Sequence, residues 1–427
     1  MKYIWILLYN LLVYPIFFIF GCILCLFNKK IRDGIIGRFR SIKILQESFN
    51  QLDNTNQIYW FHAASLGEFY QVKPIMEGLK DIEPDSRCLL SFSSPSGFEN
   101  AHSSAIYCKI YMPFDFFWSI HKAFKIVKPR KIIFASYDIW PNMIWVAQFL
   151  NIHTNIFSAR VKDGSIKLLF GIISFYRSIY RDMSSIYTVS KKDYNRIKHI
   201  VGNKGNPVIR SLGNPRYDMV KQSSDDFTVL HQRTVIEREK RIIIGSSHNE
   251  DDDVIIPVLI NKLKNDNTLS ILYTPHEPSK ENINQIISKF NLGGFSANIS
   301  DTRILKKIPN NRIVIINSVG ILNKLYWLGR IAYIGGGFSS GIHNVMEPAI
   351  ARLPVIFGPK YHHAHEAEEL LKYGGGICIK GSTEFNDALD YLLNDDKYFK
   401  KVSLSATNVI HKNLGSSTRI IRSLIRD

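Results

Sequence analysis

The chain has few cysteines, and their positions exclude a disulfide-stabilised fold. Only five occur in 427 residues: two lie inside an apolar N-terminal run and three are scattered. No Cys/His spacing is typical of zinc ligation, so the sequence predicts no zinc site. Unpaired cysteines agree with a reducing compartment such as the cytoplasm.

Acidic residues are scarce relative to basic ones. The chain has 54 Lys and Arg against 37 Asp and Glu, a formal net charge of +17. This excess favours an anionic partner, which is nucleic acid, membrane lipid or a phosphorylated substrate. A nucleic-acid binder is disfavoured because the sequence has no recognition motif and its basic residues are dispersed.

Charge is absent altogether between Ile4 and Phe27. A run of this length can cross a hydrocarbon core of about 30 Å as a helix. No small-residue cleavage site follows it, so residues 1–30 are expected to be an uncleaved anchor that spans or is embedded in the membrane. The positive-inside rule then leaves the rest of the chain in the cytoplasm, because basic residues cluster just after the run. These are Lys29, Lys30, Arg32, Arg38 and Arg40.

After the anchor, short apolar runs alternate with longer amphipathic stretches, which indicates βα units around mainly parallel sheets. A polar, charged stretch over 216–240 separates two similar patterns. We expect two doubly wound Rossmann-like domains facing a cleft, the GT-B layout, with the active site in that cleft. The expected domains are 31–220 for the acceptor and base, 221–405 for the donor, and a closing helix at 406–427.

The stretch 335–348 is the most informative in the second half. A short buried strand runs into Gly335 and Gly336, and a helix is expected to begin near Asn344. Glycines permit close backbone approach, and a helix start favours a phosphate. The carboxylate of Glu347 would accept hydrogen bonds from a ribose. The alternative is an ordinary turn in which Asn344 and Glu347 cap the helix.

The sharpest feature of the first half is the stretch 59–69, a strand that ends in a small-residue turn followed by Glu68. Glu68 is placed to take a proton from an attacking hydroxyl, as an inverting glycosyl transfer requires. The alternative is a capping box, because Ser65 and Glu68 have the Ser-x-x-Glu spacing.

Several motifs in order resemble the 3-deoxy-D-manno-octulosonic acid (Kdo) transferase family. They are Trp-x-His-Ala-x-Ser-x-Gly-Glu at 60–68, Ser-Pro-Ser-Gly at 94–97, Pro-Phe-Asp at 113–115, Trp-Pro-Asn at 140–142, Ser-Ala-Arg at 158–160, Gly-Asn-Pro at 213–215, and His-Asn-x-x-Glu-Pro at 343–348. The resemblance covers nearly the whole chain. It implies inverting transfer of Kdo from CMP-Kdo to a lipid A precursor at the cytoplasmic face of the inner membrane, with no metal and no cofactor.

Carried onto this sequence, the resemblance puts the catalytic base at Glu68 and donor-binding residues at Asn344 and Glu347. The glycines at 335 and 336 match the family's donor-domain turn. Ser246 and Ser247, just after a strand, resemble a second donor-side segment; the alternative there is a helix cap before an acidic run. Ser65 and Arg160 are expected to contact the acceptor or an anionic group, and an exposed structural ion pair is the alternative for Arg160.

The chain departs from the family pattern at two places. A Glu-x-Glu-x-Trp-Pro segment is here Ser136-Tyr-Asp138-Ile-Trp-Pro, which keeps one carboxylate, so Asp138 is the second catalytic candidate. A Pro-Arg-His-Pro segment is here Pro275-His276-Glu-Pro278, so His276 replaces a fixed positive charge on the donor side.

Two other classes of function stay open. One is another GT-B sugar-nucleotide enzyme, such as an epimerase, which would lack the pattern at 60–68. The other is a membrane-anchored binding protein that has lost catalysis, which Ser136 would favour. The joint presence of Glu68, Asn344 and Glu347 favours an active transferase.

Overall fold

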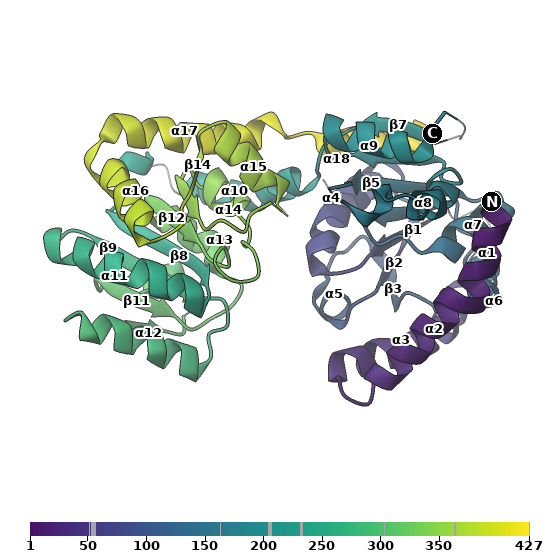
Figure 1. Ribbon diagram of the computed structural model, residues 1–427, viewed down its shortest axis with the longest axis horizontal. Coiled ribbons are helices and arrows are strands. Elements are labelled where there is room, and N and C mark those ends of the chain that lie inside the picture. Colours follow the sequence, from purple (N-terminus) through teal and green to yellow (C-terminus); the bar gives the residue numbers. More distant parts are fainter. Residues whose placement is uncertain are drawn as a thin grey trace. The chain divides into compact units, whose positions relative to one another are not determined.

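The computed structural model (Figure 1) describes residues 1–50, 52, 57–162, 164–203, 207–230, 234–302, 304–362 and 364–426. The chain forms two compact units. Unit 1 comprises Met1–Met219 and Gly415–Asp427, and unit 2 comprises Val220–Leu414.

Unit 1 is built on a seven-stranded sheet whose paired strands are all parallel. Its central strands are buried along their whole length, as expected for a parallel sheet covered on both faces. The strand order is β3-β2-β1-β4-β5-β6-β7. The strands are β1 (Ile58–Ala63), β2 (Arg87–Phe92), β3 (Ile106–Tyr111), β4 (Lys131–Ala135), β5 (His153–Ala159), β6 (Ser185–Thr188) and β7 (Val208–Ser211).

Amphipathic helices alternate with these strands. In α6, Ile120, Ala123, Phe124 and Val127 are buried at the i, i+3, i+4, i+7 spacing of a core-facing helix. The helical segments are α1 (Lys2–Leu8), η1 (Tyr9–Val13), α2 (Tyr14–Leu24), α3 (Lys29–Phe49), α4 (Leu66–Ile82), α5 (Pro95–Asn100), α6 (Phe117–Val127), α7 (Pro141–Phe149), η2 (Ile166–Leu168), α8 (Ile172–Tyr180) and α9 (Lys191–Val201), with α10 (Arg216–Leu230) crossing the division between the units.

The N-terminal apolar run is helical from Lys2 to Leu24 and has a mean hydropathy of 2.2. It is long and apolar enough to cross a membrane. Its polar side chains nevertheless bond to the rest of unit 1. Trp5 Nε1 donates to Ser174 Oγ at 3.1 Å, and the side-chain amides of Asn10 and Asn142 donate to each other. Its other side exposes large apolar residues, which include Ile4, Leu7, Leu11, Leu12, Ile16, Phe17, Ile19, Phe20 and Ile23.

Asp115 is the main polar tie between this helix and the sheet domain. Its fully buried carboxylate accepts from Tyr9 Oη at 2.8 Å and from the backbone N–H groups of Asn142 and Met143, both at 3.1 Å. Its own N–H donates to Tyr14 Oη at 2.6 Å. Burial raises the pKa of Asp115 to about 7 although these hydrogen bonds oppose the rise. One side chain therefore fixes both the N-terminal helix and the start of α7.

The C-terminal end returns to unit 1. The closing helix expected at 406–427 is two helices, α17 (Asp396–Lys412) in unit 2 and α18 (Ser416–Arg426) in unit 1. The break falls at Gly415, whose φ of +82° ends a helix readily. Asp218 caps the new helix by accepting from the N–H groups of Gly415 and Ser417, both at 2.6 Å. Figure 1 shows α18 in yellow beside α4.

Unit 2 repeats the same design with strand order β10-β11-β9-β8-β12-β13-β14, again parallel throughout its pairings. The strands are β8 (Arg241–Ser247), β9 (Ser270–Pro275), β10 (Asn298–Ser300), β11 (Ile313–Ile316), β12 (Ile331–Ile334), β13 (Val355–Phe357) and β14 (Gly376–Cys378). The helical segments are η3 (Val235–Glu237), α11 (Asn249–Asn265), α12 (Lys280–Leu292), η4 (Leu305–Lys307), α13 (Leu322–Leu325), η5 (Tyr326–Leu328), α14 (Met346–Ile350), α15 (His365–Lys372) and α16 (Ser382–Asn394), followed by α17.

Both sheets have a topological switch point. In unit 1 the chain runs outward from β1 through β2, then restarts on the other side of β1 at β4. In unit 2 the corresponding pair is β8 and β12. Ligands of open parallel sheets bind at the carboxyl ends of the strands at such points. The functional residues of each unit are therefore expected just after β1 and β4, and just after β8 and β12.

We predict that Asp115→Ala destabilises the protein by roughly 3 kcal/mol, because it leaves several buried donors unpaired. The N-terminal helix should also detach more readily, so limited proteolysis after the basic residues at 29–30 should accelerate. Urea denaturation of the full chain measures the first effect. Asp85→Ala, at an exposed aspartate, is the matched control; an equal loss in both variants would contradict the role given to Asp115.

Candidate functional site

Glu68 lies at the switch point of unit 1, in the first turn of α4 directly after β1. Its side chain is buried, and Oε2 accepts from the N–H of Ala64 at 2.6 Å. Within the described residues, the side chain of Ser65, the N-cap, makes no capping hydrogen bond. The capping box considered from the sequence is therefore not formed, although Glu68 does bond to the backbone just before the helix.

The pKa of Glu68 is raised to about 7. Burial is the main cause, and the nearby charge of Asp138 adds to it, while hydrogen bonds from the N–H groups of Ala64 and Tyr137 partly offset it. A carboxyl group with this pKa exchanges its proton near neutral pH. It thus has the property required of a general base or acid.

Asp138, which follows β4, has a lowered pKa instead. Burial alone would raise its pKa, but hydrogen bonds from His62 and Ser93 overcome that effect and hold the pKa at about 2. Asp138 Oδ2 lies 2.9 Å from His62 Nε2 and accepts from Ser93 Oγ at 2.6 Å. Asp138 is therefore an ionised hydrogen-bond acceptor and a poor proton acceptor. Of the two catalytic candidates, the geometry favours Glu68 as the base.

His62 connects Asp138 to the interior of the sheet and was not among the predicted site residues. Its Nδ1 lies 2.9 Å from Ser91 Oγ, which also accepts from Trp60 Nε1 at 2.8 Å. The sequence did contain a signal for these two residues, since His62 and Trp60 belong to the motif at 60–68. Their contact with Asp138, 76 positions later in the chain, is a tertiary feature that spacing does not show.

The remaining predicted residues of unit 1 lie at the same edge of the sheet. Ser136 follows β4 with φ of 58° and donates to Gln71 Oε1 at 3.0 Å. Arg160 follows β5, the neighbour of β4. Ser65 is half-exposed at the turn after β1. The structure brings all three to the carboxyl ends of β1, β4 and β5.

Unit 1 also has an open pocket of about 650 Å³ next to the segments that follow β2 and β3. Aromatic side chains of α2 and basic side chains of α3 line it, together with the Ser-Pro-Ser turn after β2. Its lining thus combines apolar rings with three basic side chains and two acidic ones, Asp33 and Glu99. The residues include Tyr14, Phe17, Phe18, Lys29, Lys30, Arg38, Ser93, Ser94, Pro95, Ser96 and Phe114.

In unit 2 the glycine turn follows β12 at the switch point, as expected. Glycine is required at 335, because a Cβ there would lie 2.2 Å from the carbonyl oxygen of Ser246. Gly336 has a φ of +87°, which favours glycine. The close approach of these two backbones brings the segment 246–248 next to the turn.

Asp251 organises this turn and was missed by the sequence reasoning, which considered the acidic run at 250–253 only as the stretch that follows a possible helix cap. It is fully buried. Its Oδ2 accepts from the N–H groups of Gly336 at 2.7 Å and His248 at 2.9 Å, and its Oδ1 accepts from Tyr333 Oη at 2.8 Å. Asp251 therefore caps α11 and also holds the glycine turn in place through hydrogen bonds.

The amides of the glycine turn are largely used within the protein. Those of Gly336 and Phe338 donate to Asp251, and those of Ser339, Gly341 and His343 donate to backbone carbonyls of the turn. The helix that follows, α14, begins at Met346, two residues after the position expected from the sequence. Anion binding by free amides of this turn, expected from the sequence, therefore has less support than binding by side chains.

Asn344 and Glu347 flank the start of α14. Asn344 Oδ1 accepts from the N–H of Met346 at 3.1 Å, which is the capping role considered as the alternative. Glu347 lies in the first turn of α14 and lines a small pocket together with Ser223, Ser224 and Trp327. Asn344 therefore shapes the turn, while Glu347 faces a pocket of unit 2.

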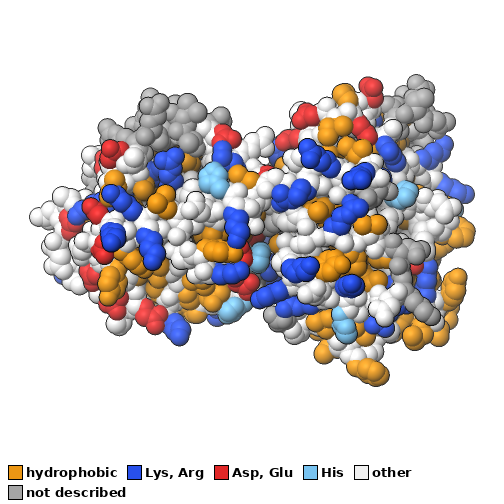
Figure 2. All heavy atoms as spheres, turned by 90° about the horizontal axis from the view of Figure 1, so that it is seen from above, with side chains coloured by type: hydrophobic (Ala, Val, Ile, Leu, Met, Phe, Trp, Pro, Cys, Tyr) orange, Lys and Arg blue, Asp and Glu red, His pale blue; other side chains and the backbone are white. Residues whose placement is uncertain are grey.

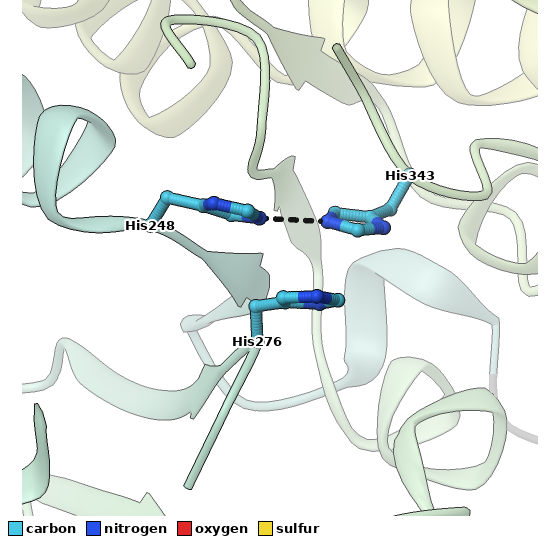
Figure 3. Close-up of side chains that lie close together, drawn as sticks. All are labelled: His248, His276 and His343. Carbon is cyan, nitrogen blue, oxygen red and sulfur yellow. Dashed lines mark hydrogen bonds between the residues drawn. The ribbon is translucent and has the colours of Figure 1, made fainter. Parts of the chain in front are cut away.

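His276 follows β9 and completes the donor-side set. Its backbone N–H donates to the carbonyl of Ser247 at 2.9 Å, which ties the ends of β9 and β8 together. Burial and the neighbouring His248 lower the pKa of His276. Its ring stacks on those of His248 and His343, as Figure 3 shows. Ser246, with φ of 56°, and the buried Ser247 lie beside it.

Comparison with known proteins finds similar sequences over most of the chain. A sequence model of the 3-deoxy-D-manno-octulosonic-acid transferase family matches residues 38–219. The chain is 25% identical over 366 residues to a 3-deoxy-D-manno-octulosonic acid transferase of Chlamydia pneumoniae, covering 80% of this chain and 78% of that protein. It is 26% identical over 353 residues to the transferase of Aquifex aeolicus, covering 82% and 90%.

The fold is also found among solved structures. A UDP-GlcNAc 2-epimerase from Neisseria meningitidis superposes with a TM-score of 0.60 at 12% identity, covering 87% of this chain and all of that one. This likeness shows the fold alone. It confirms the predicted GT-B-like class, with two Rossmann-like units and one apolar N-terminal helix. The family model over residues 38–219 and the relatives at 25–26% identity support the Kdo transferase family and indicate a glycosyltransferase.

Proposed function

We propose that the protein transfers Kdo from CMP-Kdo to a lipid A precursor with inversion at the anomeric carbon. The observation that carries the proposal is a buried glutamate, Glu68, with a pKa of about 7 at the switch point of unit 1, in a chain of the Kdo transferase family. This residue is suited to accept a proton from a hydroxyl near neutral pH.

In the proposed step, the ionised Glu68 takes the proton of an acceptor hydroxyl while that oxygen attacks the anomeric carbon of Kdo. The bond from that carbon to the phosphate oxygen breaks, and CMP leaves with the electron pair. Asp138 stays ionised throughout, because His62 and Ser93 hold it. Its charge raises the pKa of Glu68, so the two carboxylates have different tasks.

Unit 2 is proposed to bind the donor. Glu347 would accept hydrogen bonds from ribose hydroxyls, since an ionised carboxylate is an acceptor only. Ser246, Ser247 and His276 would contact the phosphate or the Kdo carboxylate, while Gly335, Gly336 and Asn344 shape the turn that presents them. In this assignment side chains bind the anionic groups of the donor, because the backbone amides of the turn are already bonded within the protein.

The pocket of unit 1 supports a phosphorylated lipid as the acceptor. The rings of Phe17 and Phe18 suit acyl chains, and Lys29, Lys30 and Arg38 suit phosphates. Ser65 and Arg160 are proposed to contact the acceptor nearer to Glu68. Figure 2 shows Lys and Arg dispersed over the visible face, which favours a local basic pocket over an extended nucleic-acid surface.

The N-terminal helix is proposed to hold the enzyme at the inner membrane, with the catalytic units on the cytoplasmic face. Its apolar side is exposed, while its polar side bonds to unit 1. Because that polar side is already engaged, we infer that the helix is embedded along the membrane surface rather than separated from the domain. The basic residues after it would meet anionic head groups.

The first prediction concerns transfer itself. Purified full-length protein with CMP-Kdo and a lipid A precursor should give a lipid whose mass is raised by one or more Kdo units. Glu68→Gln should lose roughly 100-fold or more of this activity, the usual contribution of a general base. The wild-type kcat/KM should rise with pH through about 7 and then level, because Glu68 must be ionised to accept a proton.

Glu47→Gln, at an exposed glutamate of α3, is the control for that experiment. Binding of CMP without transfer would point to another acceptor or to a binding protein without catalysis. Full activity of Glu68→Gln would show that Glu68 only supports the helix start, and would make Asp138 the next candidate.

A second prediction separates a functional base from a structural cap. The folded-state pKa of Glu68 lies above its ordinary value of 4.5, so ionising it costs stability, increasingly as pH rises from about 4.5 to 7. The difference corresponds to about 3 kcal/mol. Glu68→Gln should therefore be more stable than wild type at pH 8, by up to that amount, and nearly equal to it at pH 4. Thermal unfolding at the two pH values tests this; a less stable variant at pH 8 favours the cap.

A third prediction concerns the donor. Glu347→Gln should raise the KM for CMP-Kdo roughly tenfold or more and change kcat less, because it weakens hydrogen bonds that are made before the transition state. Steady-state kinetics at saturating acceptor measures this. Glu281→Gln, at an exposed glutamate of α12, should match wild type; a fall in kcat alone would remove Glu347 from donor binding.

A further inference from the structure

Three histidines from distant parts of the chain meet at the switch point of unit 2. His248 follows β8, His276 follows β9, and His343 lies in the loop after β12. These three strands are adjacent in the sheet, in the order β9-β8-β12. Among the described residues, these histidines form a group in which one ring nitrogen from each residue lies within 4.8 Å of those from the other two.

Backbone hydrogen bonds fix the position of each histidine. The N–H of His248 donates to the buried carboxylate of Asp251 at 2.9 Å. Those of His276 and His343 donate to the carbonyls of Ser247 at 2.9 Å and Gly335 at 3.2 Å. The three Cα positions are thus held by the same contacts that close the glycine turn, so the cluster is built into the fold.

The rings face one another closely, as Figure 3 shows. His248 and His343 meet edge to edge, with 3.0 Å between their Nε2 atoms. The ring of His276 stacks against both, with centroid distances of 4.6 Å to His248 and 4.4 Å to His343. Because one Nε2 donates to the other, the pair shares a single proton at its centre.

We propose that His248, His276 and His343 bind one divalent transition-metal ion, with Zn²⁺ as the reference ion, through their ring nitrogens. Two imidazole nitrogens on a tetrahedral zinc ion lie about 3.3 Å apart, from Zn–N bonds of about 2.0–2.1 Å. The Nε2 atoms of His248 and His343 need to separate by only about 0.3 Å from their present 3.0 Å. The ion then takes the place of the proton between them. That proton moves to Nδ1 of the ring that donates it, so both imidazoles stay neutral and carry their N–H on Nδ1.

His276 supplies the third ligand by turning its ring. It is stacked at present, so its in-plane lone pair does not point between the other two nitrogens. Its side chain is the exposed one of the three, which leaves it free to rotate about its side-chain bonds. Three protein ligands leave one tetrahedral position open to water or to an anionic oxygen.

The ligand set selects the class of ion. Three neutral imidazoles suit Zn²⁺, Co²⁺, Ni²⁺ or Cu²⁺, whereas Mg²⁺ and Ca²⁺ require oxygen ligands. The buried carboxylate of Asp251, which holds the backbone of His248, is already bonded to Tyr333, Gly336 and His248. Asp251 would therefore orient the site without joining it. The proposal concerns metal binding by unit 2 and stands independently of the transfer proposed above.

The test is a titration of the full-length, chelator-treated protein with Co²⁺, without donor or acceptor. Wild type should bind one equivalent with the intense visible absorption of tetrahedral Co²⁺, and Zn²⁺ should displace it. His276→Phe and His343→Phe keep a flat ring for stacking but remove the ligand, so each should weaken binding by roughly 100-fold or more. His411→Ala, at an exposed histidine of α17, should bind as wild type does.

Circular dichroism of each variant before titration confirms that it is folded. The proposal is overturned if folded wild type shows no tetrahedral Co²⁺ spectrum, or if both phenylalanine variants bind the ion as tightly as wild type. Because no transfer is measured, a failure here leaves the proposed function unaffected, and a failure of the transfer assay leaves this site unaffected.

Discussion

The position of the first strand inside each sheet governs where chemistry can occur in this protein. Because β1 and β8 each have neighbours on both sides, the connections that leave the two sides of the strand diverge at its carboxyl end. Side chains from loops that are remote in sequence are thereby collected at one edge. In unit 1 the loops after β1 and β4 bring Glu68 and Asp138 together, and in unit 2 the loops after β8, β9 and β12 bring the three histidines together.

Environment then separates the roles of residues that are chemically alike. Glu68 and Asp138 are both carboxylates at one sheet edge, yet one has a pKa of about 7 and the other about 2. The difference arises because Asp138 accepts from two side chains, while Glu68 has backbone donors that do not offset its burial. Pairs of titratable groups whose environments drive their pKa values apart are typical of acid–base sites. Residue type and spacing alone do not show this difference in pKa.

The sequence predicted the regular elements well where hydrophobic periodicity was strong. The strand expected at the start of the stretch 59–69 agrees with β1, and the short buried strand expected before Gly335 agrees with β12. The short edge strand β7 and the basic helix α3 were missed, because neither has the buried apolar pattern of an interior element. Asp251 and His62 were missed for another reason: their roles come from partners far away in the chain, and no local pattern records such contacts. The three-histidine cluster is of the same kind, since the spacings between 248, 276 and 343 match no metal motif.

Backbone strain marks the same places as the side-chain chemistry. Ser136, Ser158 and Ser246 all adopt left-handed conformations, with φ of 58°, 52° and 56°, although none is glycine. Each costs on the order of 1–3 kcal/mol, and such strain persists only where surrounding contacts hold it. All three lie at the ends of strands at the switch-point edges, after β4, within β5 and within β8. Ser246 is additionally pressed against Gly335, where no side chain could fit. Glycine at these turns would relax the strain. Lys128, Asn151 and Arg352 are also left-handed, so strain alone does not mark a site; at the three serines it fixes the direction of the chain at a strand end and the hydroxyl presented there.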